Sequence, residues 1–258
     1  MKAPARDPTS DALYSGTMAL HQPARGEGYR VNVDAVLLAW FAGKERRANR
    51  AIDLGSGVGA VGLSLLYRDR AEHVLFVEQA SLLARLCSEN LEANGWTARG
   101  EACCADVSND GARLAEARAD LVVCNPPYVP IGRGRPPLVA TTARMGELSV
   151  FTTAARRALG RRGRACFVYP AAELVTLLAT LRASGLEAKR LCLVHSSEGE
   201  PARVVLLEAM PAKPGGLLVM PPFVERDEHG PSAAMTAVLA PALASAPSKP
   251  FTGKRAYV

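Results

Sequence analysis

Short apolar runs alternate with longer amphipathic segments along most of the chain. The short runs predict strands, and the longer segments, with apolar positions three and four residues apart, predict helices. The predicted strands are residues 51–54, 73–77, 102–105, 121–124, 164–169, 186–194 and 203–209. The predicted helices are residues 58–67, 81–93, 147–159 and 171–183. This alternation favours a mostly parallel sheet with helices on both faces.

The two last predicted strands follow each other directly. No crossover helix fits between them, so they are expected to pair antiparallel. A further helix is predicted ahead of the first strand, with Asp34 as its cap and Gly43 at its end. The whole pattern predicts an α/β fold with a seven-stranded, mostly parallel sheet whose last strand is antiparallel.

The composition divides the chain into one domain and two extensions. Residues 1–17 are rich in Pro, Ser and Asp and are expected to form a mobile N-terminal arm. Residues 18–240 are expected to form the domain, and residues 241–258 a flexible basic tail. With 48% hydrophobic and 22% charged residues, the chain is expected to be globular rather than disordered or fibrous.

Charge, hydropathy and cysteine content narrow the possible partners. The net charge of +6 permits a polyanionic partner but does not require one. No apolar run approaches the ~20 residues that span a bilayer, so no membrane partner is expected. The six cysteines form no C-x-x-C pair and the histidines lack the spacing of metal ligands. We therefore expect free thiols, no metal and a cytoplasmic location.

A glycine-rich segment, Asp53-Leu54-Gly55-Ser56-Gly57-Val58-Gly59, joins the first strand of the alternating pattern to the helix that follows. Glycines let the backbone turn tightly and approach a ligand closely. Glu78 follows the second strand and Asp106 follows the third. The carboxyl ends of parallel strands meet at one edge, where ligands bind. These acids therefore predict a nucleoside cofactor site, with Glu78 on the ribose and Asp106 on the adenine amino group.

The acid ahead of the first glycine distinguishes between nucleoside cofactors. A dinucleotide would place its pyrophosphate at the helix N-terminus. Asp53 stands two residues before Gly55, where a carboxylate repels pyrophosphate but suits a cation. S-adenosylmethionine carries an ammonium and a sulfonium group. The loop therefore favours S-adenosylmethionine over NAD or FAD.

The fourth strand is followed by Asn125-Pro126-Pro127-Tyr128. A conjugated amide or amino nitrogen is a poor nucleophile because its lone pair is delocalised. The Asn125 side-chain oxygen and the Pro126 carbonyl can each accept a hydrogen bond from one N–H group of such a nitrogen. These two bonds direct the nitrogen lone pair toward a methyl donor. The prolines stiffen these acceptors. Tyr128 can stack on a flat substrate. These four residues are the predicted catalytic set.

Together the two motifs resemble the class I S-adenosylmethionine-dependent methyltransferases that modify amide or exocyclic amino nitrogens, which have a Rossmann-like fold. Gln22, residues 28–39, residues 195–204 and residues 217–222 resemble, more specifically, the bacterial tRNA adenine-N6 methyltransferases that act on valine tRNA. The resemblance covers roughly residues 18–240. It implies methyl transfer to the N6 amino group of an adenine in the anticodon-loop region of a tRNA substrate.

The resemblance also implies a set of cofactor-binding residues. These are Asp34, Asp53, Gly55, Ser56, Gly57, Gly59, Glu78, Asp106, Val107 and Asn125. In many members of the family an aromatic residue follows the Gly-x-Arg lead-in, whereas Val31 and Asn32 stand there in this chain. That departure could alter how the substrate or the methionine part of the cofactor is covered.

Three arginines near the catalytic tetrapeptide are candidates for RNA contacts. Arg133 and Arg135 lie in the following loop and could clamp phosphate or be solvated, and Arg144 is a weaker candidate. One rival function is that of a protein glutamine N5-methyltransferase, although the 52 residues before Asp53 are too few for its usual helical domain. Another is a non-catalytic RNA-binding module.

Overall fold

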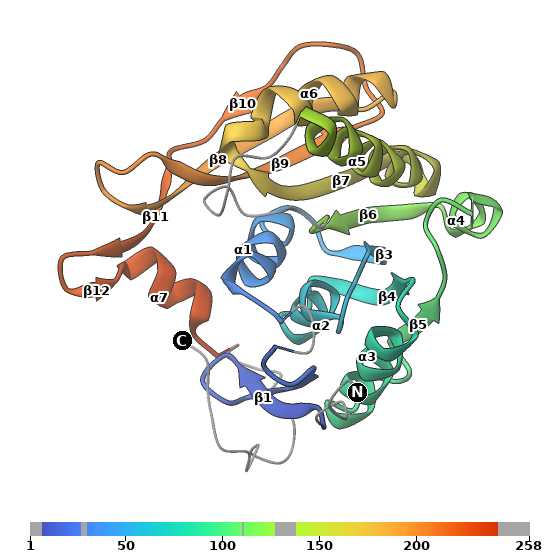
Figure 1. Cartoon of the computed structure of the whole chain (residues 1–258), viewed down its shortest axis with the longest axis vertical. Coiled ribbons are helices and arrows are strands. Elements are labelled where there is room, and N and C mark those ends of the chain that lie inside the picture. Colours follow the sequence, from blue (N-terminus) through green and yellow to red (C-terminus); the bar gives the residue numbers. More distant parts are fainter. Residues whose placement is uncertain (1–6, 27–29, 110, 127–137, 242–258) are drawn as a thin grey trace.

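Strand and helix alternate through the middle of the computed structural model, around a central twisted sheet (Figure 1). The structure describes residues 7–26, 30–109, 111–126 and 138–241. Within them the sheet has ten strands. They are β3 (Ala48–Leu54), β4 (Ala71–Glu78), β5 (Gly100–Cys104), β6 (Ala119–Cys124), β7 (Leu159–Pro170), β8 (Glu187–Ser197), β9 (Ala202–Met210), β10 (Leu218–Val219), β11 (Phe223–Asp227) and β12 (Gly230–Pro231).

Helices cover both faces of this sheet. They are α1 (Val33–Ala42), α2 (Ala60–Tyr67), α3 (Ser81–Ala93), α4 (Gly111–Ala117), α5 (Leu138–Ala158), the 3-10 turn η1 (Ala171–Glu173), α6 (Leu174–Ala183) and α7 (Ala233–Leu239). Helix α5 begins well before the predicted residue 147, and α4 is not among the predicted helices. Among the described residues, no helix has both the length and the apolar character that a membrane crossing requires.

Seven of the strands have the order β5-β4-β3-β6-β7-β9-β8. All neighbouring pairs from β5 to β7 are parallel, and β9 lies antiparallel between β7 and β8. This confirms the mostly parallel α/β sheet and its antiparallel seventh strand. The chain leaves β3 toward β4 on one side and returns to β6 on the other. The crevice beyond the carboxyl end of such a reversal point is where ligands bind in open α/β sheets.

The sheet extends further than the seven expected strands, because β10 and β11 both pair parallel with the outer edge of β8, and β12 pairs with β11. Two of these strands are only two residues long. Strand β10 lies in a four-residue apolar run, Leu217–Met220, between glycines and prolines, and β12 has no apolar run. The extension packs on α1 through an edge-to-face contact of Phe223 with Trp40, at 4.9 Å between ring centres. Met235 and Val238 of α7 are buried beneath it.

Residues 9–22, most of which are expected in a mobile arm, form instead an antiparallel hairpin of β1 (Thr9–Leu13) and β2 (Met18–Gln22). Side-chain amides of α3 and of the residue that ends it hold the hairpin. Asn94 accepts from and donates to the backbone of Ala19, and Asn90 does the same at His21. These amides imitate a neighbouring strand, a tertiary role that an apolar pattern cannot show.

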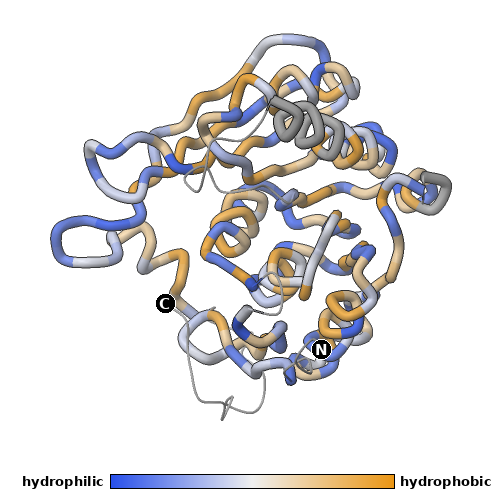
Figure 2. The backbone as a smooth tube through the Cα atoms, viewed as in Figure 1, coloured by the Kyte–Doolittle hydropathy of each residue, from blue (hydrophilic) through white to orange (hydrophobic). Residues whose placement is uncertain are grey.

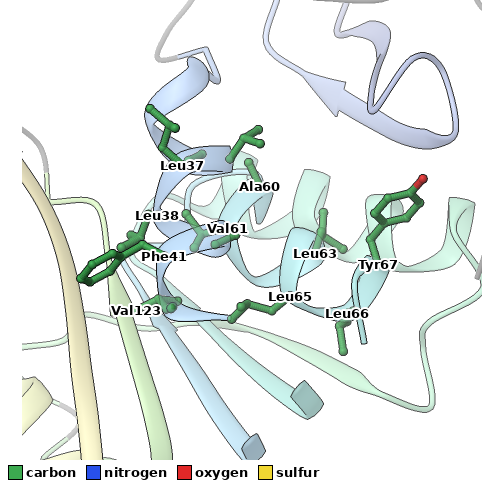
Figure 3. Close-up of a cluster of buried hydrophobic side chains, with 14 of the residues drawn as sticks. Leu37, Leu38, Phe41, Ala60, Val61, Leu63, Leu65, Leu66, Tyr67 and Val123 are labelled. Atoms are coloured by element: carbon green, nitrogen blue, oxygen red, sulfur yellow. The ribbon is translucent and has the colours of Figure 1, made fainter. Parts of the chain in front are cut away.

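Two apolar layers hold the helices to the sheet, and the apolar segments of the tube in Figure 2 lie mainly inside the molecule. Side chains of β6 alternate between them: Leu121 and Val123 face α1 and α2, whereas Val122 and Cys124 face α5 and α6. Figure 3 shows Leu37, Leu38 and Phe41 of α1 packed near Val61 and Leu65 of α2. All of α2 is buried, which fixes the helix that begins at the glycine loop. Four of the six free cysteines are also buried: Cys87, Cys124, Cys166 and Cys192.

Candidate active site

The carboxyl ends of β3, β4 and β6, with the loop after β5, surround a cavity of about 580 Å³. This edge is where the order of strands reverses. Eight of the ten predicted cofactor residues line it: Asp53, Gly55, Ser56, Gly57, Glu78, Asp106, Val107 and Asn125. The strand ends therefore bring together residues that are up to 72 positions apart in sequence.

The glycine loop is tied to the end of β4 by hydrogen bonds. The N–H groups of Gly55 and Ser56 donate to the carbonyl of Val77 at 2.9 and 3.1 Å. The Glu78 carboxylate accepts from Gly57 N–H at 2.9 Å and from Ala80 N–H at 2.8 Å, one bond on each oxygen. Each oxygen keeps a further lone pair, because an ionised carboxylate can accept about four hydrogen bonds. Glu78 can thus hold both loops and still receive ribose hydroxyls.

Asp53 is buried at the base of the glycine loop. Its Oδ2 accepts from the Gly62 N–H of α2 at 2.8 Å. Burial raises the pKa of Asp53 to about 7; the Gly62 hydrogen bond works against this rise, and the Glu78 carboxylate adds to it. A cation placed in the cavity would favour the ionised form of Asp53, because opposite charges nearby lower the pKa of an acid.

Asp106 differs from Asp53 in its environment. Its Oδ1 accepts from the backbone N–H of Ser108 at 2.8 Å. This bond, helped by the Ser108 hydroxyl, holds the pKa of Asp106 below its usual value. Asp106 therefore presents an ionised acceptor beside the apolar Val107 and Leu83 of the cavity wall. A planar ring with an amino group suits that combination.

Two predicted cofactor residues have other positions. Gly59 precedes α2 at φ +91°, where a Cβ would meet the Cys87 sulfur at 2.7 Å, so it serves helix packing. Asp34 is not the cap of α1: the Asn32 side chain accepts from its N–H, and Asn32 is the cap. The carboxylate of Asp34 forms an ion pair with Arg203 at 2.7 Å. Its neighbours Val31 and Ala35 line the cavity instead.

Of the predicted catalytic residues, Asn125 lines the cavity and Pro126 is buried directly after β6. Pro127 and Tyr128 lie outside the described residues, as do Arg133, Arg135 and the side chain of Arg144. The position of Asn125 next to the glycine loop agrees with a role at the reacting end of the cavity.

The sequence does not reveal the aromatic wall of the cavity. Phe151 of α5 lines it and packs so closely on Gly55 that a Cβ there would lie 2.9 Å from the ring. Gly55 also has φ +66°, a conformation that favours glycine. Along the sequence Phe151 is one apolar residue of an ordinary helix, so no local signal separates it from the core.

The residues present suit S-adenosylmethionine. Ser56 Oγ is buried at the cavity without a hydrogen-bond partner among the described residues, and a Cβ added to Gly57 would meet only open space. A polar ligand can form a hydrogen bond with Ser56 Oγ and fill the open space beside Gly57. The acids of the cavity suit the positive charges of S-adenosylmethionine. In the described part of the chain, no group of three or more His, Cys, Asp or Glu side chains could hold a metal ion.

Solved methyltransferase structures share this fold. A predicted O-methyltransferase from Agrobacterium tumefaciens superposes with a TM-score of 0.62 and 23% identity, over 82% of this chain and 99% of that one. The M. jannaschii protein TYW2, in complex with AdoMet, gives a TM-score of 0.55 at 13% identity, over 81% and 89%. The strand order and these likenesses define a class I methyltransferase fold.

The family follows from the sequence match. Residues 32–172, more than half of the chain, match the family described as methyltransferase small domain, and the chain belongs to this family. A protein of Aeromonas hydrophila named tRNA1(Val) (adenine(37)-N6)-methyltransferase is 31% identical over 69% of this chain and 75% of its own length. A protein of Shewanella halifaxensis with the same name is 29% identical over 70% and 74%.

Proposed function

We propose that the protein transfers a methyl group from S-adenosylmethionine to the N6 amino group of adenine 37 in valine tRNA, the reaction for which its relatives are named. One observation carries the proposal. Three acids from successive strand ends and Asn125 line a single cavity. That arrangement offers a site for a cationic nucleoside beside an acceptor for an amino group.

The cofactor supplies an electrophilic methyl group on a sulfonium when bound. Asp53 and the glycine loop hold its cationic methionine part, Glu78 its ribose and Asp106 its adenine. Burial makes the Asp53 interaction strong, because charges attract more strongly where water is excluded. Phe151 and Ala35 of α1 line the same cavity as the glycine loop and would exclude water from part of it.

Asn125 and the Pro126 carbonyl orient the target amine. Each accepts a hydrogen bond from one N–H group of the amine, so the nitrogen lone pair projects toward the methyl group. The reaction needs no strong base, since the proton can leave after the transfer. Tyr128 stacks on the target base in this proposal. The base must be unstacked to reach these residues, as bases of an anticodon loop can be. Because the proposed substrate is a tRNA, we propose a cytoplasmic location as well.

The test uses labelled S-adenosylmethionine and a valine tRNA transcript, followed by mass spectrometry of the nucleosides. N6-methyladenosine at position 37 is the expected product, and a transcript with guanine at that position should stay unmodified. Label in protein rather than RNA would point to a different substrate. Absence of transfer with confirmed cofactor binding would reject the proposed reaction.

The matched variant is Asn125→Ala. Because Asn125 acts on the amine, its removal should lower turnover by roughly 10²-fold or more, the usual scale for a group that stabilises the transition state. Binding of S-adenosylmethionine, measured by calorimetry, should change little. Equal losses in turnover and cofactor affinity would assign Asn125 to the cofactor instead.

A further inference from the structure

Arg203 connects three segments at the carboxyl edge of the sheet. It lies near the start of β9, and its Nη1 is 2.7 Å from Asp34 Oδ1 in the first turn of α1. Its Nε and Nη2 donate to the two carboxylate oxygens of Glu225 in β11, at 3.2 and 2.7 Å. One guanidinium therefore bridges two acids from different parts of the chain.

Asp34 requires such a cation. Its residue is only 1% exposed, and a carboxylate removed from water is stable only when it is paired and hydrogen-bonded. The Asn32 side-chain amide donates to its Oδ2 at 3.1 Å, and Arg203 supplies the opposite charge. Without Arg203, the buried Asp34 carboxylate would lose the opposite charge beside it.

A movement of Asp34 would reach the cavity directly. It stands between Val31 and Ala35, and both of these line the cavity. The backbone N–H of Val31 is in turn held by the Gln22 side-chain oxygen at 3.0 Å. The cavity wall thus includes Val31, just ahead of α1, and Ala35 in the first turn of α1.

Glu225 fixes the other side of the bridge. It is 8% exposed and belongs to the strand that pairs with β8 at the widened edge of the sheet. Ser232 N–H donates to its carbonyl at 2.9 Å. Both Arg203 and Glu225 lie beyond residues 32–172, the part that matches the family. The bridge therefore joins the C-terminal extension to the site of the family domain.

We infer that Arg203 is a positioning residue of the cofactor site: its contacts with Asp34 and Glu225 hold the first turn of α1 in the wall of the cavity. It acts through Asp34, which explains why an acid within the lead-in segment lies beside the cavity without lining it. This inference rests on the proposed cofactor site.

The first test compares Arg203→Met with Arg182→Met. Arg182 also forms a two-bond pair with a carboxylate, Glu187, at 3.0 Å for both bonds, but it is exposed and is not among the residues that line the cavity. Calorimetry should show roughly ten-fold weaker S-adenosylmethionine binding for Arg203→Met, the effect expected when a charged partner is lost. The control should bind as the wild type does.

The second test is a rescue. Asp34→Asn added to Arg203→Met removes the uncompensated charge at position 34, beside the cavity wall, and keeps an acceptor for Asn32, so affinity should return to within a few-fold of the wild type. Failure of the rescue would overturn the inference, since it would mean that Arg203 acts through the ligand, through packing or through Glu225 rather than through Asp34. Unchanged affinity of Arg203→Met would overturn it as well.

The two proposals fail in different ways. If the wild type binds no S-adenosylmethionine, the proposed function fails. Thermal unfolding then still shows whether Asp34→Asn restores the melting temperature that Arg203→Met lowers. If Arg203→Met does not fold, the double variant alone decides. It leaves no unpaired charge at position 34, and near-wild-type affinity supports the bridge, whereas strongly reduced affinity in a folded double variant refutes it.

Discussion

Replacing Asp53 by Asn should stabilise the ligand-free protein and weaken the binding of S-adenosylmethionine. Burial raises the pKa of Asp53 from 3.8 to about 7. An acid with a raised pKa binds its proton more tightly in the folded state. Its contribution to stability is therefore complete below the unfolded pKa and is lost as the pH rises through about 7. Above that pH the folded protein carries a destabilising buried charge.

The magnitude follows from the shift. About three pKa units at about 1.4 kcal/mol each give an upper bound of about 4 kcal/mol. The amide of Asp53→Asn would keep an oxygen for the Gly62 N–H and would carry no charge. We expect a higher melting temperature for Asp53→Asn than for the wild type at about pH 8, and a smaller difference at about pH 5, where Asp53 is mostly protonated in the folded protein.

Cofactor binding should respond in the opposite direction. With a pKa of about 7, Asp53 is ionised in about one molecule in eleven at pH 6 and in about ten of eleven at pH 8. If the bound cation requires the ionised form, the affinity should rise about ten-fold over this range. Asp53→Asn should abolish that rise and bind roughly ten- to a hundred-fold more weakly at pH 8.

Calorimetry and thermal unfolding of both proteins across the pH range measure the two effects. Ionisation of the ligand itself is common to wild type and variant, so the difference between them isolates Asp53. The reasoning is refuted if Asp53→Asn is less stable than the wild type at about pH 8. It is also refuted if the two pH profiles of affinity are parallel.

Three further variants test the cavity wall and its supports. In Glu78→Gln, an NH₂ group replaces one of the two carboxylate oxygens that accept from the backbone N–H groups of Gly57 and Ala80. This change should weaken S-adenosylmethionine binding roughly ten-fold; unchanged calorimetric affinity would contradict the role of Glu78. Gly55→Ala places a methyl group against the Phe151 ring and should reduce affinity, with Phe151→Ala in the same chain restoring part of it. Asn90→Ala removes the side-chain amide that donates to the backbone carbonyls of His21 and Val58; denaturant unfolding should show a loss of about 1–3 kcal/mol, while Glu89→Gln on the exposed side of α3 should change little.

The polar residues of the site were predictable because each ends a strand or closely follows one. A short apolar run locates a strand, and parallel strands place their carboxyl ends at one edge. Asp53, Glu78, Asp106 and Asn125 therefore line one cavity, as expected. The chemistry of each also follows from residue type and position, before any distance is known.

The supports of the site could not be predicted in the same way. Their roles depend on contacts between segments that are far apart in sequence. Asp34 is predicted from sequence to be a cofactor ligand, yet its carboxylate pairs with Arg203, 169 positions away. The strands of the hairpin and of the extension are short and only partly apolar, so their pairing partners, rather than their own sequence, determine that they are strands.

Substitutions at strand ends and substitutions at the supports should affect the cavity differently. A residue at a strand end is positioned by the backbone of the sheet, so its replacement alters mainly the chemistry at that point. A wall residue such as Val31 or Ala35 is positioned by side chains behind it, among them Gln22, Asp34 and Arg203. Buried polar supports of this kind are costly when only one partner is removed, because the remaining group is left unpaired. Replacements at the supports should therefore change stability and cofactor affinity together, and pairwise replacements should recover both.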